Sequence, residues 1–99
     1  MNKDNVCEVL EKNNIDILSE EGNIINIMYE FDDVEIASSK SFCENDEEIK
    51  TFLVELAEDN LTEILEEIEE ELGVICKLRE VEYSHLSYIK YSLELTNIN

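Results

Sequence analysis

The chain has 99 residues, of which 43% are hydrophobic, with no proline and two glycines, a composition that suits one domain with a sizeable core. Its formal net charge of −19 argues against direct binding to nucleic acid and against docking on an anionic membrane, since both need a basic face. Such a charge favours a basic partner protein.

The cysteines and the lengths of the apolar runs indicate the cellular compartment in which the protein is expected. Cys7, Cys43 and Cys76 are an odd number without a C-x-x-C pair, so we expect free thiols in a reducing compartment. The N-terminal segment lacks the apolar run of a signal peptide, and no apolar run approaches the length of a membrane span. We therefore expect a cytoplasmic protein, and its Ile/Asn/Glu/Lys-rich composition is typical of an AT-rich bacterial or phage genome.

The first third of the chain predicts one helix followed by strands. Helically spaced apolar residues predict a short helix over residues 4–14, and an apolar run predicts a short strand over 15–18. Alternation over residues 24–31 predicts the clearest strand. One face is expected to carry Ile25, Ile27, Tyr29 and Phe31, and the other Ile24, Asn26, Met28 and Glu30.

A third strand is expected directly after this one. Asp32-Asp33 is read as a two-residue turn, although it lacks the usual glycine. Residues 34–38 would then return as a strand with Val34 and Ile36 inward.

The next stretch carries most of the charge. Between residues 44 and 71 there are 13 acids and one lysine, a net charge of −12. Blocks of like charge are often disordered, but apolar residues recur here at helical spacing and need a core to pack on. Asn45 followed by Glu48 is a capping-box pattern, so we expect a folded helical segment that begins at residue 46.

The apolar face of this segment changes direction along its length. Successive residues of a helix are about 100° apart around its axis. On that basis the apolar residues of the first half of the segment are centred about 10° from Ile49, and those of the second half about 115° from it. We therefore predict two helices, 46–58 and 61–72, joined by a bend at Asp59-Asn60. Gly73 is expected to end the second helix.

The remaining chain predicts a hairpin. Strands are expected over residues 74–83 and 86–95 with a turn at 83–85, and whether this hairpin joins the main sheet is left open. The resulting fold is one α+β domain over residues 1–99, in the order αβββααββ. We expect an antiparallel sheet with helices packed on one face.

No motif marks a catalytic, cofactor or metal site. The only histidine, His85, lies in a predicted turn, far in sequence from the glutamates that could join it as metal ligands. We therefore expect a protein that is not an enzyme and needs no cofactor or metal. The roles of His85 and of the three cysteines are left open.

Two interpretations of the acidic segment remain. It is either a solvated surface that keeps the protein soluble, or a face that imitates the phosphates of a nucleic acid. The second explains why glutamates four residues apart, such as Glu63 and Glu67, repel each other without lysines between them. The residues expected to bind a basic partner are Asp32, Asp33, Glu55, Glu58, Asp59, Glu63, Glu66, Glu67, Glu70 and Glu71.

A small, very acidic chain with one helix, three strands and two acidic helices resembles phage anti-CRISPR proteins that mimic DNA. Residues 35–39 and 44–49 look similar to the strand-to-helix junction of one such family, whose members plug the PAM-reading cleft of the CRISPR nuclease. The final hairpin departs from that family. The resemblance implies a non-enzymatic inhibitor that blocks a basic DNA- or RNA-binding groove of a CRISPR-Cas effector. The alternative is an immunity protein or an acidic regulatory subunit that binds another basic protein.

Overall fold

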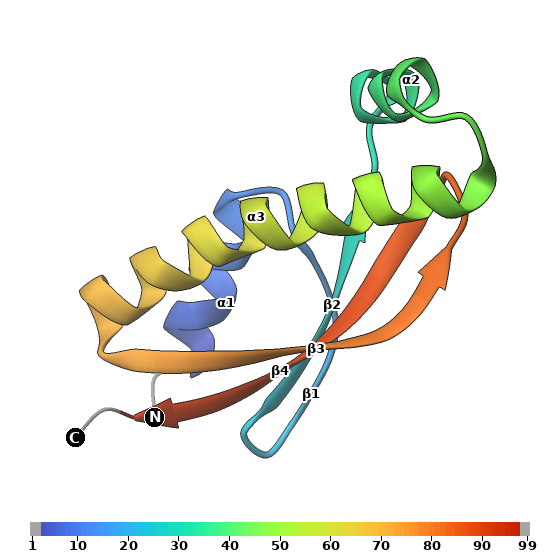
Figure 1. Cartoon of the computed structure of the whole chain (residues 1–99). Helices are drawn as coiled ribbons and strands as arrows, with labels where there is room; N and C mark the ends of the chain where they lie inside the picture. The colour runs from blue at the N-terminus through green and yellow to red at the C-terminus, as the bar shows by residue number, and fades with distance from the viewer. Residues whose placement is uncertain (1–2, 98–99) are drawn as a thin grey trace.

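A computed structural model describes residues 3–97 and shows the chain order αββααββ (Figure 1). The elements are α1 (Lys3–Lys12), β1 (Asp16–Glu21), β2 (Ile24–Glu30), α2 (Asp33–Phe42), α3 (Asp46–Leu72), β3 (Val74–Ser84) and β4 (Tyr88–Asn97). The prediction of one α+β domain with an antiparallel sheet is confirmed, but the predicted order αβββααββ is wrong in the middle of the chain.

The four strands form one sheet in the order β1-β2-β4-β3, and every neighbouring pair is antiparallel. The C-terminal hairpin therefore joins the main sheet, which answers the question that the sequence left open. Its second strand, β4, pairs with β2 from Ile24↔Glu94 to Glu30↔Tyr88. This pairing places the most apolar strands in the centre and leaves β1 and β3 as the edges.

One face of the sheet carries the core. The alternation predicted for residues 24–31 is confirmed, because Ile25, Ile27, Tyr29 and Phe31 are buried. The inward residues of β4 are buried in the same core: Ile89, Tyr91, Leu93 and Leu95. Helix α3 crosses this face and α1 packs beside it, while α2 stands off beyond the N-terminal half of α3 (Figure 1).

The third predicted strand is wrong, because residues 34–38 belong to α2. Asp32 is the N-cap of this helix, with its carboxylate accepting a 2.7 Å hydrogen bond from the Glu35 amide. The Glu35 carboxylate in turn accepts a 2.9 Å bond from the Asp32 amide, which completes a capping box. The residues that the sequence analysis assigned to a hairpin turn therefore start a helix.

The two predicted acidic helices are one continuous helix, α3, of 27 residues. Its buried positions begin as an i, i+4 series at Ile49, Leu53, Ala57 and Leu61. Each such step advances about 40° around a helix, so the buried stripe winds about the axis. A straight helix that crosses a twisted sheet buries a stripe of this kind. The change of direction that predicted a bend at Asp59-Asn60 is therefore a result of packing.

The predicted ends of the acidic segment are confirmed. Asn45 is the N-cap, and its side-chain oxygen accepts a hydrogen bond from the Glu48 amide at 2.9 Å. Gly73 is the C-cap in the left-handed conformation, with a φ of 66°. Within residues 3–97, no helix is both long enough and apolar enough to span a membrane.

Candidate partner-binding surface

Helix α3 carries eight of the ten predicted partner-binding residues on its solvent side. All eight are exposed except Glu67, which is half-buried. Five of them follow one another at spacings of three or four residues, which confines them to about 80° of the helix circumference, opposite the buried stripe. We call Glu55, Asp59, Glu63, Glu66 and Glu70 the outward row.

The outward row is straight and regular because the helix is uninterrupted. At a rise of about 1.5 Å per residue, its carboxylates recur every 4.5 to 6 Å along the axis and span about 22 Å. The remaining three residues widen this surface, Glu58 on one side and Glu67 and Glu71 on the other. The structure thus gathers these eight acids on one element.

Nothing in the described part of the chain neutralises the outward row. The ion pairs found between residues 3 and 97 are Lys3–Glu20, His85–Asp46 and Lys90–Glu82. The one lysine of α3, Lys50, lines a hollow together with Glu55 but forms no ion pair with it, and its ammonium lies 5.3 Å from the centre of the Tyr83 ring. The mutual repulsion of these carboxylates is therefore unrelieved within residues 3–97.

The basic residues of the sheet lie on the face that α3 does not cover. Lys77 and Arg79 alternate with Cys76 and Leu78, which pack against the core, and Lys90 lies between the buried Ile89 and Tyr91. The same face also carries Glu82, which forms an ion pair with Lys90, and Glu94, which lies opposite Lys77. The bases of the sheet therefore have acidic neighbours of their own.

The structure does not bring Asp32 and Asp33 into the same row. Both belong to the start of α2, and Asp32 uses its carboxylate as the N-cap. Their prediction as part of a hairpin turn is wrong, because the turn does not exist. The main candidate surface is therefore carried by α3.

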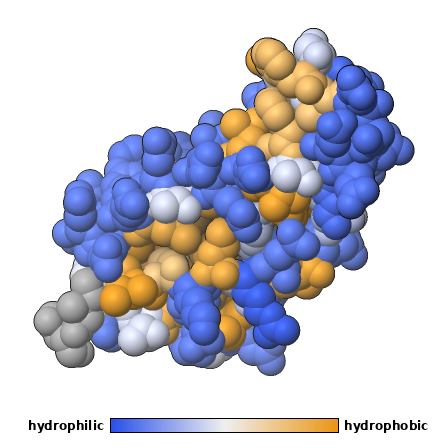
Figure 2. Space-filling view, in the orientation of Figure 1, coloured by the Kyte–Doolittle hydropathy of each residue, from blue (hydrophilic) through white to orange (hydrophobic). Residues whose placement is uncertain are grey.

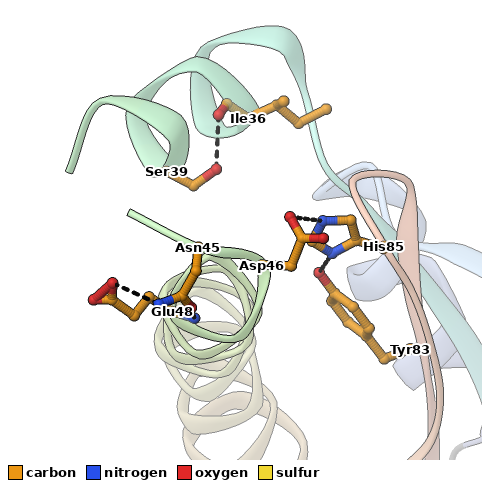
Figure 3. A network of polar contacts seen from close by, with 7 residues as sticks. All are labelled: Ile36, Ser39, Asn45, Asp46, Glu48, Tyr83 and His85. Carbon is orange, nitrogen blue, oxygen red and sulfur yellow. Dashed lines mark hydrogen bonds and ion pairs between the residues drawn. The ribbon is translucent and has the colours of Figure 1, made fainter. Parts of the chain in front are cut away.

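A small polar network ties the β3–β4 turn to the start of α3 (Figure 3). His85 Nε2 lies 3.4 Å from Asp46 Oδ1, and His85 Nδ1 lies 2.8 Å from the Tyr83 hydroxyl. The Tyr83 ring also packs against Phe31, and burial raises its pKa. This contact joins the β3–β4 turn to the N-terminus of α3 at an exposed position, since the Asp46 side chain is 89% exposed.

The three cysteines are free thiols, as expected. Burial, followed by the neighbouring Glu20, raises the pKa of Cys7 to about 11, and burial raises that of Cys76 to about 11. A raised pKa keeps a thiol protonated and therefore a poor nucleophile at neutral pH. Among residues 3–97, no group of three or more His, Cys, Asp or Glu side chains is placed to hold a metal ion.

Helix α2 exposes apolar side chains that the sequence pattern does not predict. Val34 is 74% exposed and Phe42 is 79% exposed. Figure 2 shows hydrophobic atoms at the projecting end of the molecule where Figure 1 places α2. The Phe42 ring stacks on Phe52 of α3, with 6.3 Å between centroids and 16° between planes. The prediction that Val34 faces inward is wrong. For Phe42, the available signal was a phenylalanine at the end of a serine-rich stretch.

Comparison with known proteins adds no relative: no family model, curated protein or solved structure matches this chain.

Proposed function

We propose that this protein is a non-enzymatic inhibitor that occupies a basic nucleic-acid-binding groove of a partner protein. In its most specific form, the partner is a CRISPR-Cas effector and the carboxylates of α3 take the place of DNA or RNA phosphates. The observation that carries the proposal is the outward row, which is straight, exposed and free of ion pairs within residues 3–97.

The density of charge on α3 supports this proposal. The helix has 12 acids and one lysine over 27 residues, or about 40 Å at a rise of about 1.5 Å per residue. This is about one negative charge per 3.4 Å, comparable to one strand of duplex DNA. The outward row alone is sparser, so the flanking glutamates are needed for the match. A basic groove that binds phosphates gains free energy from the release of counter-ions. It would gain this both when it binds a nucleic acid and when it binds the carboxylates of α3.

The resemblance to anti-CRISPR proteins adds less support than the charge does. It rested on one helix, three strands and two acidic helices, whereas the chain has two strands before α2 and a single acidic helix. The proposal therefore depends on the arrangement of the carboxylates, and the CRISPR-Cas effector is the partner class to be tested first.

The alternative is an immunity protein or an acidic regulatory subunit for a different basic protein. The exposed Val34 and Phe42 favour it, because phosphate mimicry needs only carboxylates, whereas apolar anchors typically serve specific protein interfaces. Both functions use the same acidic side of α3. The identity of the partner separates them.

The proposal is tested with a variant in which Glu63, Glu66 and Glu70 are all replaced by Lys. Purified Cas9-type and other CRISPR nucleases are assayed for target-DNA binding and cleavage at low and high salt. The wild-type protein is expected to inhibit at least one nuclease, less strongly at high salt, and the triple variant is expected to lose this inhibition.

The matched control replaces three exposed acids outside α3, Glu11, Glu21 and Glu94, by Lys, because it changes the net charge equally. This control is expected to keep the inhibition. If both triple variants inhibit as the wild type does, or if salt has no effect, the phosphate-mimic proposal is wrong. If no nuclease is inhibited, partners captured from lysate with and without nuclease treatment test the alternative.

A further inference from the structure

The corner between α2 and α3 contains a hollow with an aromatic wall and an acidic rim. Its volume is about 370 Å³. Phe52 and Thr51 of α3 form one side, and Cys43 of the α2–α3 connection forms the other. Phe52 is in turn stacked against the exposed ring of Phe42. The hollow therefore adjoins an aromatic pair that is open to solvent.

Three carboxylates surround this hollow. Glu48 is partly committed to the N-cap of α3, because its Oε1 accepts hydrogen bonds from the Glu44 amide at 3.1 Å and from Asn45 Nδ2 at 3.3 Å. Glu47 and Glu55 are exposed and belong to no ion pair within residues 3–97. The three carboxylates give the site a negative charge, and no ion pair within residues 3–97 involves them.

The nearest base along the helix is Lys50. It lines an adjoining hollow together with Glu47 and Glu55, and its ammonium lies 5.3 Å from the centre of the Tyr83 ring. No ion pair found within residues 3–97 joins Lys50 to Glu47, Glu48 or Glu55, so these carboxylates are open to a positive charge from another molecule. Because Glu55 is also the first member of the outward row, a partner seated on that row would reach the hollow directly.

We infer that this hollow binds an arginine side chain of the basic partner. A guanidinium is planar and weakly hydrated, so it stacks on an aromatic ring while donating hydrogen bonds to carboxylates at its edge. The Phe52 wall and the Glu47 and Glu55 rim offer both kinds of contact. A lysine ammonium is a compact, strongly hydrated charge and gains less from the ring.

This inference rests on the proposed function, which supplies a basic partner, and it adds a specific anchor to that function. The outward row attracts positive charge of any kind, whereas the hollow distinguishes arginine from lysine. The two parts of the surface therefore predict different responses to the same substitutions.

The experiment compares acetylated, amidated tetra-arginine and tetra-lysine as probes, by calorimetry at about 0.1 M salt, where surface charges are partly screened. The wild-type protein is expected to bind tetra-arginine about fivefold to tenfold more tightly than tetra-lysine, as a stacked cation warrants. Glu55→Gln and Phe52→Leu are each expected to bring this ratio close to one.

The matched control is Glu66→Gln, which removes the same charge from the outward row about 16 Å further along the helix. It is expected to weaken both peptides equally and to keep their ratio. If Phe52→Leu does not fold, Phe42→Ala removes the exposed ring of the stacked pair instead and is expected to lower the ratio.

A wild-type protein that binds both peptides equally, or a Glu55→Gln variant that keeps the preference for arginine, overturns the inference. These outcomes are independent of the nuclease assay. If the Glu63, Glu66 and Glu70 variant loses inhibition while no arginine preference exists, the proposed function stands without this anchor. If the preference exists and no nuclease is inhibited, the anchor stands and the effector proposal fails.

Discussion

The Tyr29 hydroxyl donates a 2.6 Å hydrogen bond to the Glu35 carboxylate. The same hydroxyl accepts a 2.7 Å bond from Asn60 Nδ2. One buried side chain of β2 therefore fixes the first turn of α2 and the middle of α3 relative to the sheet. Burial, followed by the bond to Glu35, raises the pKa of Tyr29 to about 12, so the hydroxyl keeps its proton and its role as donor.

Replacing Tyr29 by Phe is expected to lower the free energy of unfolding by about 1.5 to 3 kcal/mol, because a bond to a carboxylate is lost and Asn60 loses its acceptor. Urea denaturation measures the change. Tyr88→Phe is the matched control, since its hydroxyl bonds to the carboxylate of Glu82 at 2.9 Å in an exposed position. Equal losses in the two variants would contradict a linking role for Tyr29.

The continuity of α3 is tested by Thr62→Pro. In the continuous helix, position 62 is interior, and proline is expected to cost about 3 kcal/mol or more. Had a second helix begun at residue 61, as the sequence analysis expected, proline at position 62 would fall in its first turn and be tolerated. Circular dichroism and urea denaturation report the loss of helix and of stability.

Asp46→Pro is the control for this substitution. Asp46 is the first residue of α3, and the preceding Asn45 has an extended backbone with a φ of −143°. That conformation is compatible with a following proline. The variant loses only the exposed contact with His85, so it is expected to remain close to wild-type stability. If Thr62→Pro is as stable as Asp46→Pro, the continuous helix is wrong.

The sequence predicted the elements whose signals are local. The strand at 24–31 was readable because alternating burial is a property of the strand itself. The start of α3 at Asn45 and its end at Gly73 were readable because caps depend on a few adjacent residues. Eight of the twelve acids of α3 were selected as candidates from charge alone, and five of these eight follow one row of the helix.

The errors come from features that depend on the rest of the fold. The rotation of the apolar stripe in α3 reflects the twist of the sheet beneath it, which no local pattern contains. The start of α2 could have been predicted, because Asp32 and Glu35 have the spacing of a capping box, but these residues were assigned to a hairpin turn and a strand. The hollow beside Phe52 was unpredictable, since it depends on how α2 turns back over α3.

The cysteines are expected to differ in reactivity. At about pH 8, buried thiols with a pKa near 11 hold about a hundredfold less thiolate than an unfolded cysteine. A disulfide reagent should therefore label Cys7 and Cys76 slowly in the folded protein and fast in urea. Cys43, which is more open, should react before them, and its raised pKa keeps it slower than a free thiol. Fast labelling of Cys7 at neutral pH would contradict its burial.

The same groups predict a loss of stability at alkaline pH. Cys7 and Cys76 have folded pKa values above the ordinary value of 9.0, so the folded state holds their protons more tightly than the unfolded state. Their contribution is fully present below about pH 9 and is lost as pH rises through about 11. Urea denaturation across this window measures the decline. In the Cys7→Ala and Cys76→Ala double variant, the free energy of unfolding should decline less over the same pH range.

Salt is expected to stabilise the protein at neutral pH. Raising the salt from about 0.02 M to about 0.5 M shortens the Debye length to a few ångströms and screens the repulsion along α3. The melting temperature should rise by several degrees. A variant with Glu63→Lys and Glu70→Lys places bases between the remaining acids and should melt higher at low salt with a weaker salt response. A melting temperature independent of salt would contradict unrelieved repulsion.

The unbroken backbone of α3 limits the shape of any partner that the protein can engage. A helix fixes the spacing of its backbone, so the first and last residues of the outward row stay about 22 Å apart along the axis in solution and in a complex, and their carboxylates move only within the reach of the side chains. A trough of at least that length, without strong curvature, can contact all five at once. A shorter or domed cationic region leaves some of them in water, so the protein selects partners by length and straightness as well as by charge.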